Sequence, residues 1–180
     1  TLHQYSGETD LVFGVVVSGR SAPLAGVESR AGLYINTLPL RIRMDSGQSA
    51  LEWIRAILKQ QIALEQYAHT PPGVPGRCAG IPAGQPLFNS AIRFQNYPSV
   101  DAGASIENGV GMRNLTGVDW WHYPLNVVVV PDSRVKLTIR YDARFFEADG
   151  VRRILQAMTS CLSRLPNLSE ETELQALLSG

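Results

Sequence analysis

The segment GLYINTLPLR, residues 32–41, carries the pattern that decides the fold. Its apolar residues predict a buried strand, yet Asn36 and Thr37 stand in the middle of it. A buried amide or hydroxyl group without a hydrogen-bond partner costs about 1 to 3 kcal/mol. Another part of the fold must therefore satisfy these two side chains.

The segments around it predict a strand, a loop, a second strand and a helix. Residues 10–17, DLVFGVVV, form an apolar run that is typical of a buried strand, and a loop over residues 18–32 leads to the next strand at residues 33–43. Residues 49–68 predict an amphipathic helix in which Ser49 and Glu52 are placed for a capping box. Its apolar stripe consists of Leu51, Ile54, Leu58 and Ile62. Residues 69–86 are rich in proline and glycine, which predicts irregular structure.

The second half of the chain predicts more strands and a long helix. Within residues 87–98 the alternation places Phe88, Ser90, Ile92 and Phe94 on one face of a strand. Residues 100–112 are typical of a mobile loop, and residues 123–142 predict a hairpin with its turn at 131–134. A stripe over residues 151–165 predicts a helix, and a short helix should begin at Ser169. This order predicts an α/β domain with a mixed sheet packed against helices.

Composition excludes several classes of protein. Sixteen basic residues balance sixteen acidic ones among 180, which argues against nucleic acid or an anionic membrane as partner. No apolar run approaches the roughly 20 residues of a membrane helix, and the first ten residues do not resemble a secretory signal. We therefore expect a cytoplasmic protein. Cys78 and Cys161 are expected to be free thiols.

No local motif indicates catalysis or metal binding. His3, His69 and His122 stand apart from any recognised nucleophile setting, and metal-ligand spacing is absent. Trp120 and Trp121 line a pocket or pack as a lid over the core.

Asp142 stands in the segment RYDARFF, residues 140–146. It either caps a turn or pairs with Arg140 or Arg144. Neither arrangement indicates an acid or base for catalysis.

Several of these segments together resemble the C-terminal half of a condensation domain from a nonribosomal peptide synthetase. Residues 10–43 are similar to the family's strand, loop and strand, with its Gly-x-x-x-Asn-Thr core at Gly32, Asn36 and Thr37. Residues 86–98, PLFNSAIRFQNYP, resemble a segment in which many members carry Asp and Glu where this chain has Asn89 and Gln95. YPLNVVVV at 123–130 and LTIRYDARFF at 137–146 complete the pattern.

The resemblance implies one lobe of a two-lobed fold related to chloramphenicol acetyltransferase, with a mixed sheet flanked by helices. Complete members join an acyl group on one carrier-protein phosphopantetheine thiol to an amine on another, through a tunnel between the lobes. Their His-His-x-x-x-Asp-Gly signature belongs to the other lobe and is absent here, since no two histidines adjoin. We therefore expect half of an amide-forming acyltransferase that is inactive alone and holds no catalytic residue of its own.

The same resemblance implies partners and boundaries. The expected partners are an N-terminal lobe, peptidyl carrier proteins and an adjacent adenylation domain, and phosphopantetheine enters on the carriers because no cofactor is bound directly. Residues 1–166 would form the lobe and residues 167–180 the start of a linker towards the adenylation domain. Two alternatives stay open: a freestanding module that docks carriers or pairs with a separate lobe, and half of an epimerisation or cyclisation relative.

The resemblance also implies where the tunnel lies. Residues 18–31 resemble the floor loop that closes the tunnel, and the region before YPLN resembles the source of a latch that crosses onto the other lobe. Asn36 and Thr37 either bond to an adjoining loop, help shape the tunnel, or are satisfied within the sheet. An exposed apolar patch should mark the interlobe face. The candidate tunnel and floor-loop residues are Ser18, Gly19, Arg20, Gly32, Asn36, Thr37, Ser90, Trp121 and Tyr123.

Overall fold

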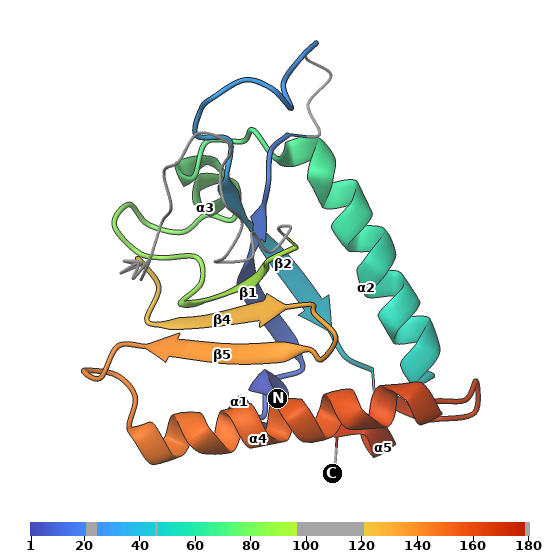
Figure 1. The fold of residues 1–180 in the computed structure, drawn as a ribbon. Helices are drawn as coiled ribbons and strands as arrows, with labels where there is room; N and C mark the ends of the chain where they lie inside the picture. Colours follow the sequence, from blue (N-terminus) through green and yellow to red (C-terminus); the bar gives the residue numbers. More distant parts are fainter. Residues whose placement is uncertain (21–24, 46, 97–120, 179–180) are drawn as a thin grey trace, which may run out of the picture.

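A mixed sheet organises the chain in the computed structural model, which describes residues 1–20, 25–45, 47–96 and 121–178 (Figure 1). The predicted mobile loop at residues 100–112, the predicted latch region before YPLN and Trp120 lie outside the described residues. The strand order is β2-β1-β3-β4-β5. The strands are β1 (Asp10–Val17), β2 (Asn36–Arg43), β3 (Ser90–Phe94), β4 (Leu125–Val130) and β5 (Lys136–Tyr141). The predicted α/β class with a mixed sheet is confirmed.

The pairing of the strands explains the mixed character of the sheet. β1 runs antiparallel to β2 along its whole length, while β3 runs parallel to both β1 and β4. β4 and β5 form the predicted antiparallel hairpin. β2 begins at Asn36, which pairs with Val17, so the polar pair opens an edge strand of the sheet instead of standing in the middle of a buried one.

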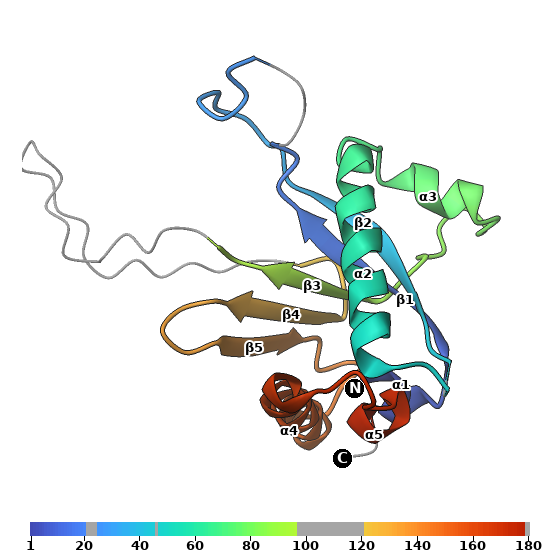
Figure 2. The same ribbon diagram turned by 90° about the vertical axis from the view of Figure 1, so that its right-hand side faces the viewer.

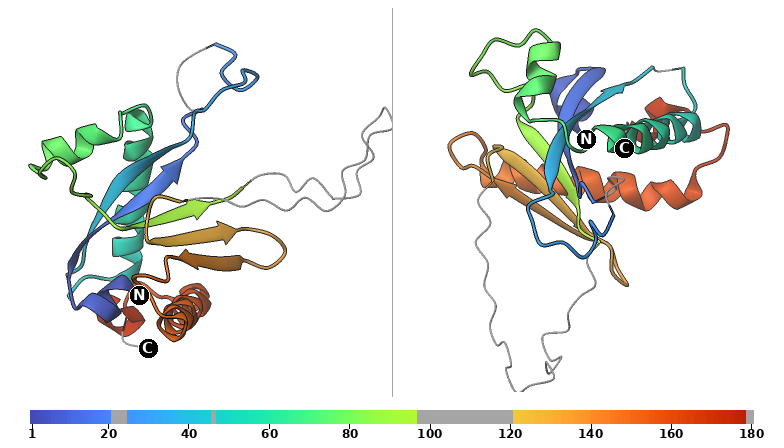
Figure 3. Two further views of the ribbon diagram at one scale, coloured as in Figure 1. Left: turned by 90° about the vertical axis from the view of Figure 1, so that its left-hand side faces the viewer. Right: turned by 90° about the horizontal axis from the view of Figure 1, so that it is seen from above.

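Helices cover one face of the sheet more fully than the other. The helices are α1 (Leu2–Ser6), α2 (Ala50–Leu64), α3 (Gly73–Cys78), α4 (Ala148–Arg164) and α5 (Leu174–Leu178). α2 runs along β1 and β2, and α2 and α4 lie on the same side of the sheet (Figure 2). α3 lies on the opposite side (Figure 3). A core cluster of Val15, Leu40 and Ile42 packs under α2.

The sheet-facing side of α2 differs from the predicted stripe. Leu58 and Ile62 are 56% and 65% exposed, and the side chains that pack on the sheet are Trp53, Ile57 and Leu64. The Trp53 indole donates a hydrogen bond to the Arg43 carbonyl at 2.9 Å, which fixes the rotation of the helix. The predicted stripe was wrong for its second half. α2 carries two apolar rows, and the row that contains Trp53, with the larger side chain, is the one that is buried.

The start of α2 also differs from the prediction. Ser49 is the N-cap residue, but its side chain makes no cap hydrogen bond to the helix. The Ser49 hydroxyl instead donates to the Glu170 carbonyl at 3.0 Å. The predicted capping box is therefore wrong, because the hydroxyl has a partner from the C-terminal segment.

The proline-rich segment is more regular than predicted. Residues 69–86 contain α3, whose first turn follows the double proline, and the Val74 amide donates to the Pro71 carbonyl. Proline is tolerated at the start of a helix because the first amides have no intrahelical acceptor. The expectation of a wholly irregular segment is wrong.

The C-terminal segment is packed onto the rest of the fold. The last helix begins at Leu174 instead of Ser169, because residues 169–172 form a turn in which the Thr172 hydroxyl accepts the Ser169 amide. Leu174 and Leu177 are buried, and the Leu174 amide donates to the Gln48 carbonyl at 2.9 Å. Part of the predicted linker thus contacts the start of α2. None of the described helices has the length and apolarity that crossing a membrane requires.

Candidate functional site

The structure distributes the predicted site residues over four places. Four of them belong to the loop between β1 and β2: Ser18, Gly19, Arg20 and Gly32. Ser90 lies at a cavity under the helices, whereas Thr37, Trp121 and Tyr123 line hollows on the opposite face of the sheet. Asn36 connects the start of β2 to the turn after α2.

Arg20 organises the loop between β1 and β2. Its Nη1 atom donates hydrogen bonds to the carbonyls of Val27 and Arg30, the latter at 3.1 Å, and its guanidinium carbon lies 4.5 Å from the centre of the Tyr34 ring. Gly19 has a φ of +64°, and a Cβ atom there would lie 2.1 Å from the Tyr34 carbonyl oxygen. This position therefore requires glycine. These contacts join the described residues on the two sides of the loop, whereas residues 21–24 of the predicted floor loop lie outside the described residues.

Asn36 answers the question that the polar pair raised. Its Nδ2 atom donates to the carbonyls of Ala68 and Thr70 at 2.9 and 2.8 Å, and its Oδ1 atom accepts the Thr37 amide at 2.8 Å. Among the expected alternatives, the bond to an adjoining loop is therefore the one observed for Asn36. The amide side chain ties the first residue of β2 to the turn where α2 ends.

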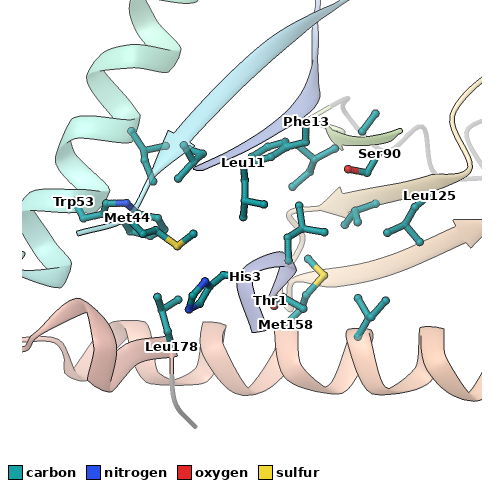
Figure 4. Close-up of a pocket in the computed structure, with 17 residues that line it drawn as sticks. Thr1, His3, Leu11, Phe13, Met44, Trp53, Ser90, Leu125, Met158 and Leu178 are labelled. Carbon is teal, nitrogen blue, oxygen red and sulfur yellow. The ribbon is translucent and has the colours of Figure 1, made fainter. Parts of the chain in front are cut away.

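An apolar cavity of about 280 Å³ lies between the sheet and helices α1, α2 and α4. Figure 4 shows Ser90 at this cavity with Phe13, Leu125 and Trp53 around it. Ile92 lines the cavity as the alternation predicted, but Phe88 and Phe94 do not. Phe88 precedes the first residue of β3, so strand alternation does not reach it.

A cleft of about 880 Å³ opens on the other face, where β3 and β4 begin and β5 ends. Its wall includes Phe88, Trp121 and Tyr123, and the rings of Phe88 and Tyr123 have their centres 5.1 Å apart. The guanidinium carbon of Arg93 lies 4.5 Å from the centre of the Trp121 ring. Thr37 shares with Phe88 and Tyr123 a neighbouring groove that runs along α3. Phe88 and Tyr123 line both hollows, so the predicted Thr37 and Trp121 lie in adjoining hollows.

Asp142 lies at the rim of the cleft and is held by Arg144. Its Oδ1 atom accepts the Arg144 amide at 2.9 Å, and its Oδ2 atom lies 2.6 Å from Arg144 Nη2. The hydrogen bonds from the Arg144 side chain, and then from its amide, hold the pKa of Asp142 below its usual range. Both predicted roles of Asp142, capping the turn and pairing with an arginine, are confirmed.

Asn126 is the cleft residue that the sequence reasoning missed. It is only 3% exposed, and its Nδ2 atom donates to the Tyr123 carbonyl. A lone amide inside the apolar run PLNVVVV was the available signal, because such a residue needs a polar partner.

The described residues carry few other reactive groups. Within them no three His, Cys, Asp or Glu side chains gather where a metal ion could be held. His122 lines the cleft, and the His3 ring is hydrogen-bonded to the Glu8 carbonyl. Cys78 and Cys161 are free, as predicted.

The sequence model of the condensation domain family matches residues 1–177. The chain belongs to this condensation domain family. One of the linear gramicidin synthase proteins from Brevibacillus parabrevis is 35% identical over 164 residues, which cover 91% of this chain and 2% of that protein. Chondramide synthase cmdD from Chondromyces crocatus is 36% identical over 141 residues, covering 78% of this chain and 4% of that protein. This condensation domain chain thus spans a small part of its curated relatives.

Solved condensation domains have the same fold. The starter condensation domain of the rhizomide synthetase RzmA superposes with a TM-score of 0.71 at 19% identity, covering 97% of this chain and 40% of that one. The first condensation domain of the CDA synthetase gives a TM-score of 0.66 at 20% identity, covering 91% of this chain and 36% of that one. The predicted fold class is therefore confirmed, and the chain spans less than half of these structures.

Proposed function

We propose that this chain is the C-terminal lobe of a nonribosomal peptide synthetase condensation domain whose complete form makes amide bonds between carrier-bound substrates. The observation that carries the proposal is the family match over residues 1–177 combined with a length that covers only about 40% of a solved condensation domain. The sequence has no adjacent histidines, so the His-His-x-x-x-Asp-Gly signature must come from the other lobe. This chain is inactive without it.

The lobe supplies tunnel wall, closure and docking surface in this proposal. The loop after β1, in which Arg20 contacts Val27 and Arg30, closes the tunnel floor, and Thr37, Trp121 and Tyr123 on one face of the sheet belong to the tunnel walls. Ser90 lies at the cavity on the opposite face and is not part of these walls. Phosphopantetheine arms enter on carrier proteins, and an adenylation domain follows residues 167–180. The reaction needs no cofactor bound to this lobe.

Exposed apolar side chains support pairing with a second lobe. Leu33, Ile35, Phe94 and Val135 are all exposed. Because β1, β3 and β4 are parallel, the loop after β1, the end of β3 and the turn after β4 lie at the same end of these strands (Figure 2). Removing such side chains from water is the main driving force of association. This end of the sheet is the interlobe face in our proposal.

The test is reconstitution of a two-lobed domain. The chain is fused behind the N-terminal lobe of a gramicidin synthase condensation domain and supplied with loaded donor and acceptor carriers, and the amide product is measured by mass spectrometry. We expect product from the fusion, none from this chain alone, and a large loss when both signature histidines of the added lobe are replaced by alanine. Amide formation by this chain alone, or a folded fusion that binds both carriers without product, contradicts the proposal. The second outcome would favour a carrier-docking module.

A further inference from the structure

The cleft of about 880 Å³ and the neighbouring groove along α3, of about 360 Å³, have three lining residues in common. These residues are Pro86, Phe88 and Tyr123, and every other described residue that lines one of the two hollows is absent from the wall of the other. The three shared residues therefore form a partition between the cleft and the groove.

Contact between two aromatic rings closes this partition. The ring centres of Phe88 and Tyr123 lie 5.1 Å apart, and the ring planes are inclined by 33°. Centre-to-centre distances of about 4.5 to 7 Å are usual for aromatic rings in contact, so no open passage runs between them. The Leu125 amide donates to the Asn89 carbonyl at 3.3 Å, which joins the two segments that carry the rings.

The Phe88 ring also lies directly on the sheet, at Gly14. A Cβ atom at Gly14 would lie 2.5 Å from Phe88 Cε2 and 2.7 Å from Thr37 Cγ2. Because side chains do not tolerate such approaches, only glycine lets the ring come this close to β1. No space is left beneath the ring through which a ligand could pass from the cleft to the groove.

The two sides of the partition differ in chemistry. The rim of the cleft carries Arg140, Asp142 and Arg144. The groove is lined mainly by prolines, glycines and aliphatic side chains, and Arg77 is the only charged residue among its described lining residues. An aliphatic chain that passed the partition would enter more apolar surroundings, which is favourable because its surface is removed from water.

We propose that Phe88 sets the length of the apolar substrate side chain that the complete domain accepts. A straight aliphatic side chain that enters the cleft ends against the Phe88 ring. A smaller residue at this position joins the groove to the cleft and admits a longer chain. Phe88 thus determines specificity and takes no part in the amide-forming step. This inference rests on the proposed function, which supplies the substrate, whereas the partition itself does not depend on it.

The first test is competition between straight-chain amino acids in the reconstituted domain. The fusion receives carriers loaded with equal amounts of α-aminobutyrate and α-aminodecanoate, on the donor and on the acceptor in turn, and mass spectrometry gives the ratio of the two amide products. We expect Phe88→Ala to raise the ratio of long to short product at least about tenfold for one of the carriers, because several more methylene groups become buried. Tyr5→Ala removes an exposed ring that lines neither hollow and should leave the ratio within about twofold.

Two further variants keep the test decisive if Phe88→Ala does not fold, since loss of a whole aromatic side chain is costly. Phe88→Leu retains apolar volume without the flat contact to Tyr123, so a smaller rise in the same direction is expected. Tyr123→Ala opens the partition from its other side and should also raise the ratio. Unchanged ratios for both carriers in folded fusions with Phe88→Ala or Phe88→Leu overturn the proposal.

A titration of the 180-residue chain tests the partition without any need for activity. The probe is the N-acetylated primary amide of α-aminodecanoate, followed through the amide resonances of Gly76 and Gly84 in the groove and of Tyr141 and Ala143 in the cleft. In Phe88→Ala both sets should move with one half-saturation concentration, because one bound chain occupies both hollows. In the unmodified chain the two sets should not share one. Independent movement of the two sets in Phe88→Ala contradicts the partition.

The two tests separate this inference from the proposed function. If the fusion makes no product but the two sets of resonances become linked in Phe88→Ala, the proposed function fails and the partition stands. If the fusion makes product and its ratio ignores Phe88, the lobe assignment stands and the specificity role of Phe88 fails.

Discussion

The two faces of the sheet differ in how completely the chain satisfies its own groups. On the helix-covered face, Val15, Leu38 and Leu40 are buried among apolar partners. On the opposite face, which we call the open face, Gly14 and Thr37 stand next to Val15 and Leu38 in the same strands. They lie beside the cleft that contains Asn126. Strand alternation assigns neighbouring residues to opposite faces, so one strand serves stability and binding at once. The difference predicts that substitutions on the two faces will have distinct effects.

Leu38→Ala should produce the largest loss of stability. Leu38 is 2% exposed under α2, and deletion of such a side chain costs about 2 to 5 kcal/mol of unfolding free energy. Urea denaturation measures this loss of unfolding free energy. Leu58→Ala is the matched control, because Leu58 is exposed on α2 and should cost less than about 1 kcal/mol. Equal costs for the two leucines would show that the buried face of α2 is wrongly assigned.

Gly14→Ala should affect the open face. A Cβ atom at Gly14 would lie 2.5 Å from Phe88 Cε2 and 2.7 Å from Thr37 Cγ2. Overpacking of this kind costs about 1 to 3 kcal/mol, and relief requires the Phe88 ring to move away from Tyr123. Urea denaturation gives the cost, and aromatic proton shifts report the ring. Gly76→Ala, where a Cβ atom meets nothing within 4 Å, is the control and should leave the ring shifts unchanged.

Asn36→Ala should loosen the join between β2 and the turn after α2. Two donated hydrogen bonds are lost, at roughly 0.5 to 1.5 kcal/mol each, so about 1 to 2 kcal/mol of stability should disappear. Hydrogen exchange should quicken at the Thr37 amide, which loses its Oδ1 acceptor. Gln60→Ala removes one exposed side-chain bond to the Arg41 carbonyl and should cost less. No change in exchange at Thr37 would contradict this account of the polar pair.

Arg144→Gln should have the smallest effect on stability. It should raise the pKa of Asp142, which the arginine lowers. The bonds from Arg144 lower that pKa, so their contribution to stability is complete above the usual value of 3.8 and is lost as pH falls through the lowered value. The substitution should raise the pKa of Asp142 towards 3.8, as measured by carboxyl NMR titration. The pKa of Asp10, which is lowered mainly by its hydrogen bond to Arg41, should stay unchanged. A shift at both carboxylates would indicate a wider rearrangement.

Local pattern was sufficient where one element determines the outcome. The strand at residues 10–17, the hairpin and the role of Asp142 follow from apolar runs, alternation and turn chemistry within a few residues. The pattern failed where two elements compete for one group. Ser49 has a capping sequence, but its hydroxyl donates to the Glu170 carbonyl in the fold, and α2 buries the row that contains Trp53.

The candidate site shows the same division. The sequence analysis named Trp121 as a residue that lines a pocket or packs over the core and Tyr123 as a tunnel candidate, and the structure places both at one cleft. It also singled out Ser90, which the structure puts at a different cavity under the helices. Asn126 escaped notice because its meaning depends on which face of β4 it occupies.

The sequence by itself determined the α/β class, most of the strands and the family, since these depend on periodicity and on short motifs such as the one at residues 32–37. Only the tertiary structure decided which groups meet. Asn36 and Ala68 are 32 residues apart in the chain, and Ser49 and Glu170 are 121 apart. Contacts over such separations arise from the packing of whole elements, whose free energy is summed over many side chains and is not written in any local pattern.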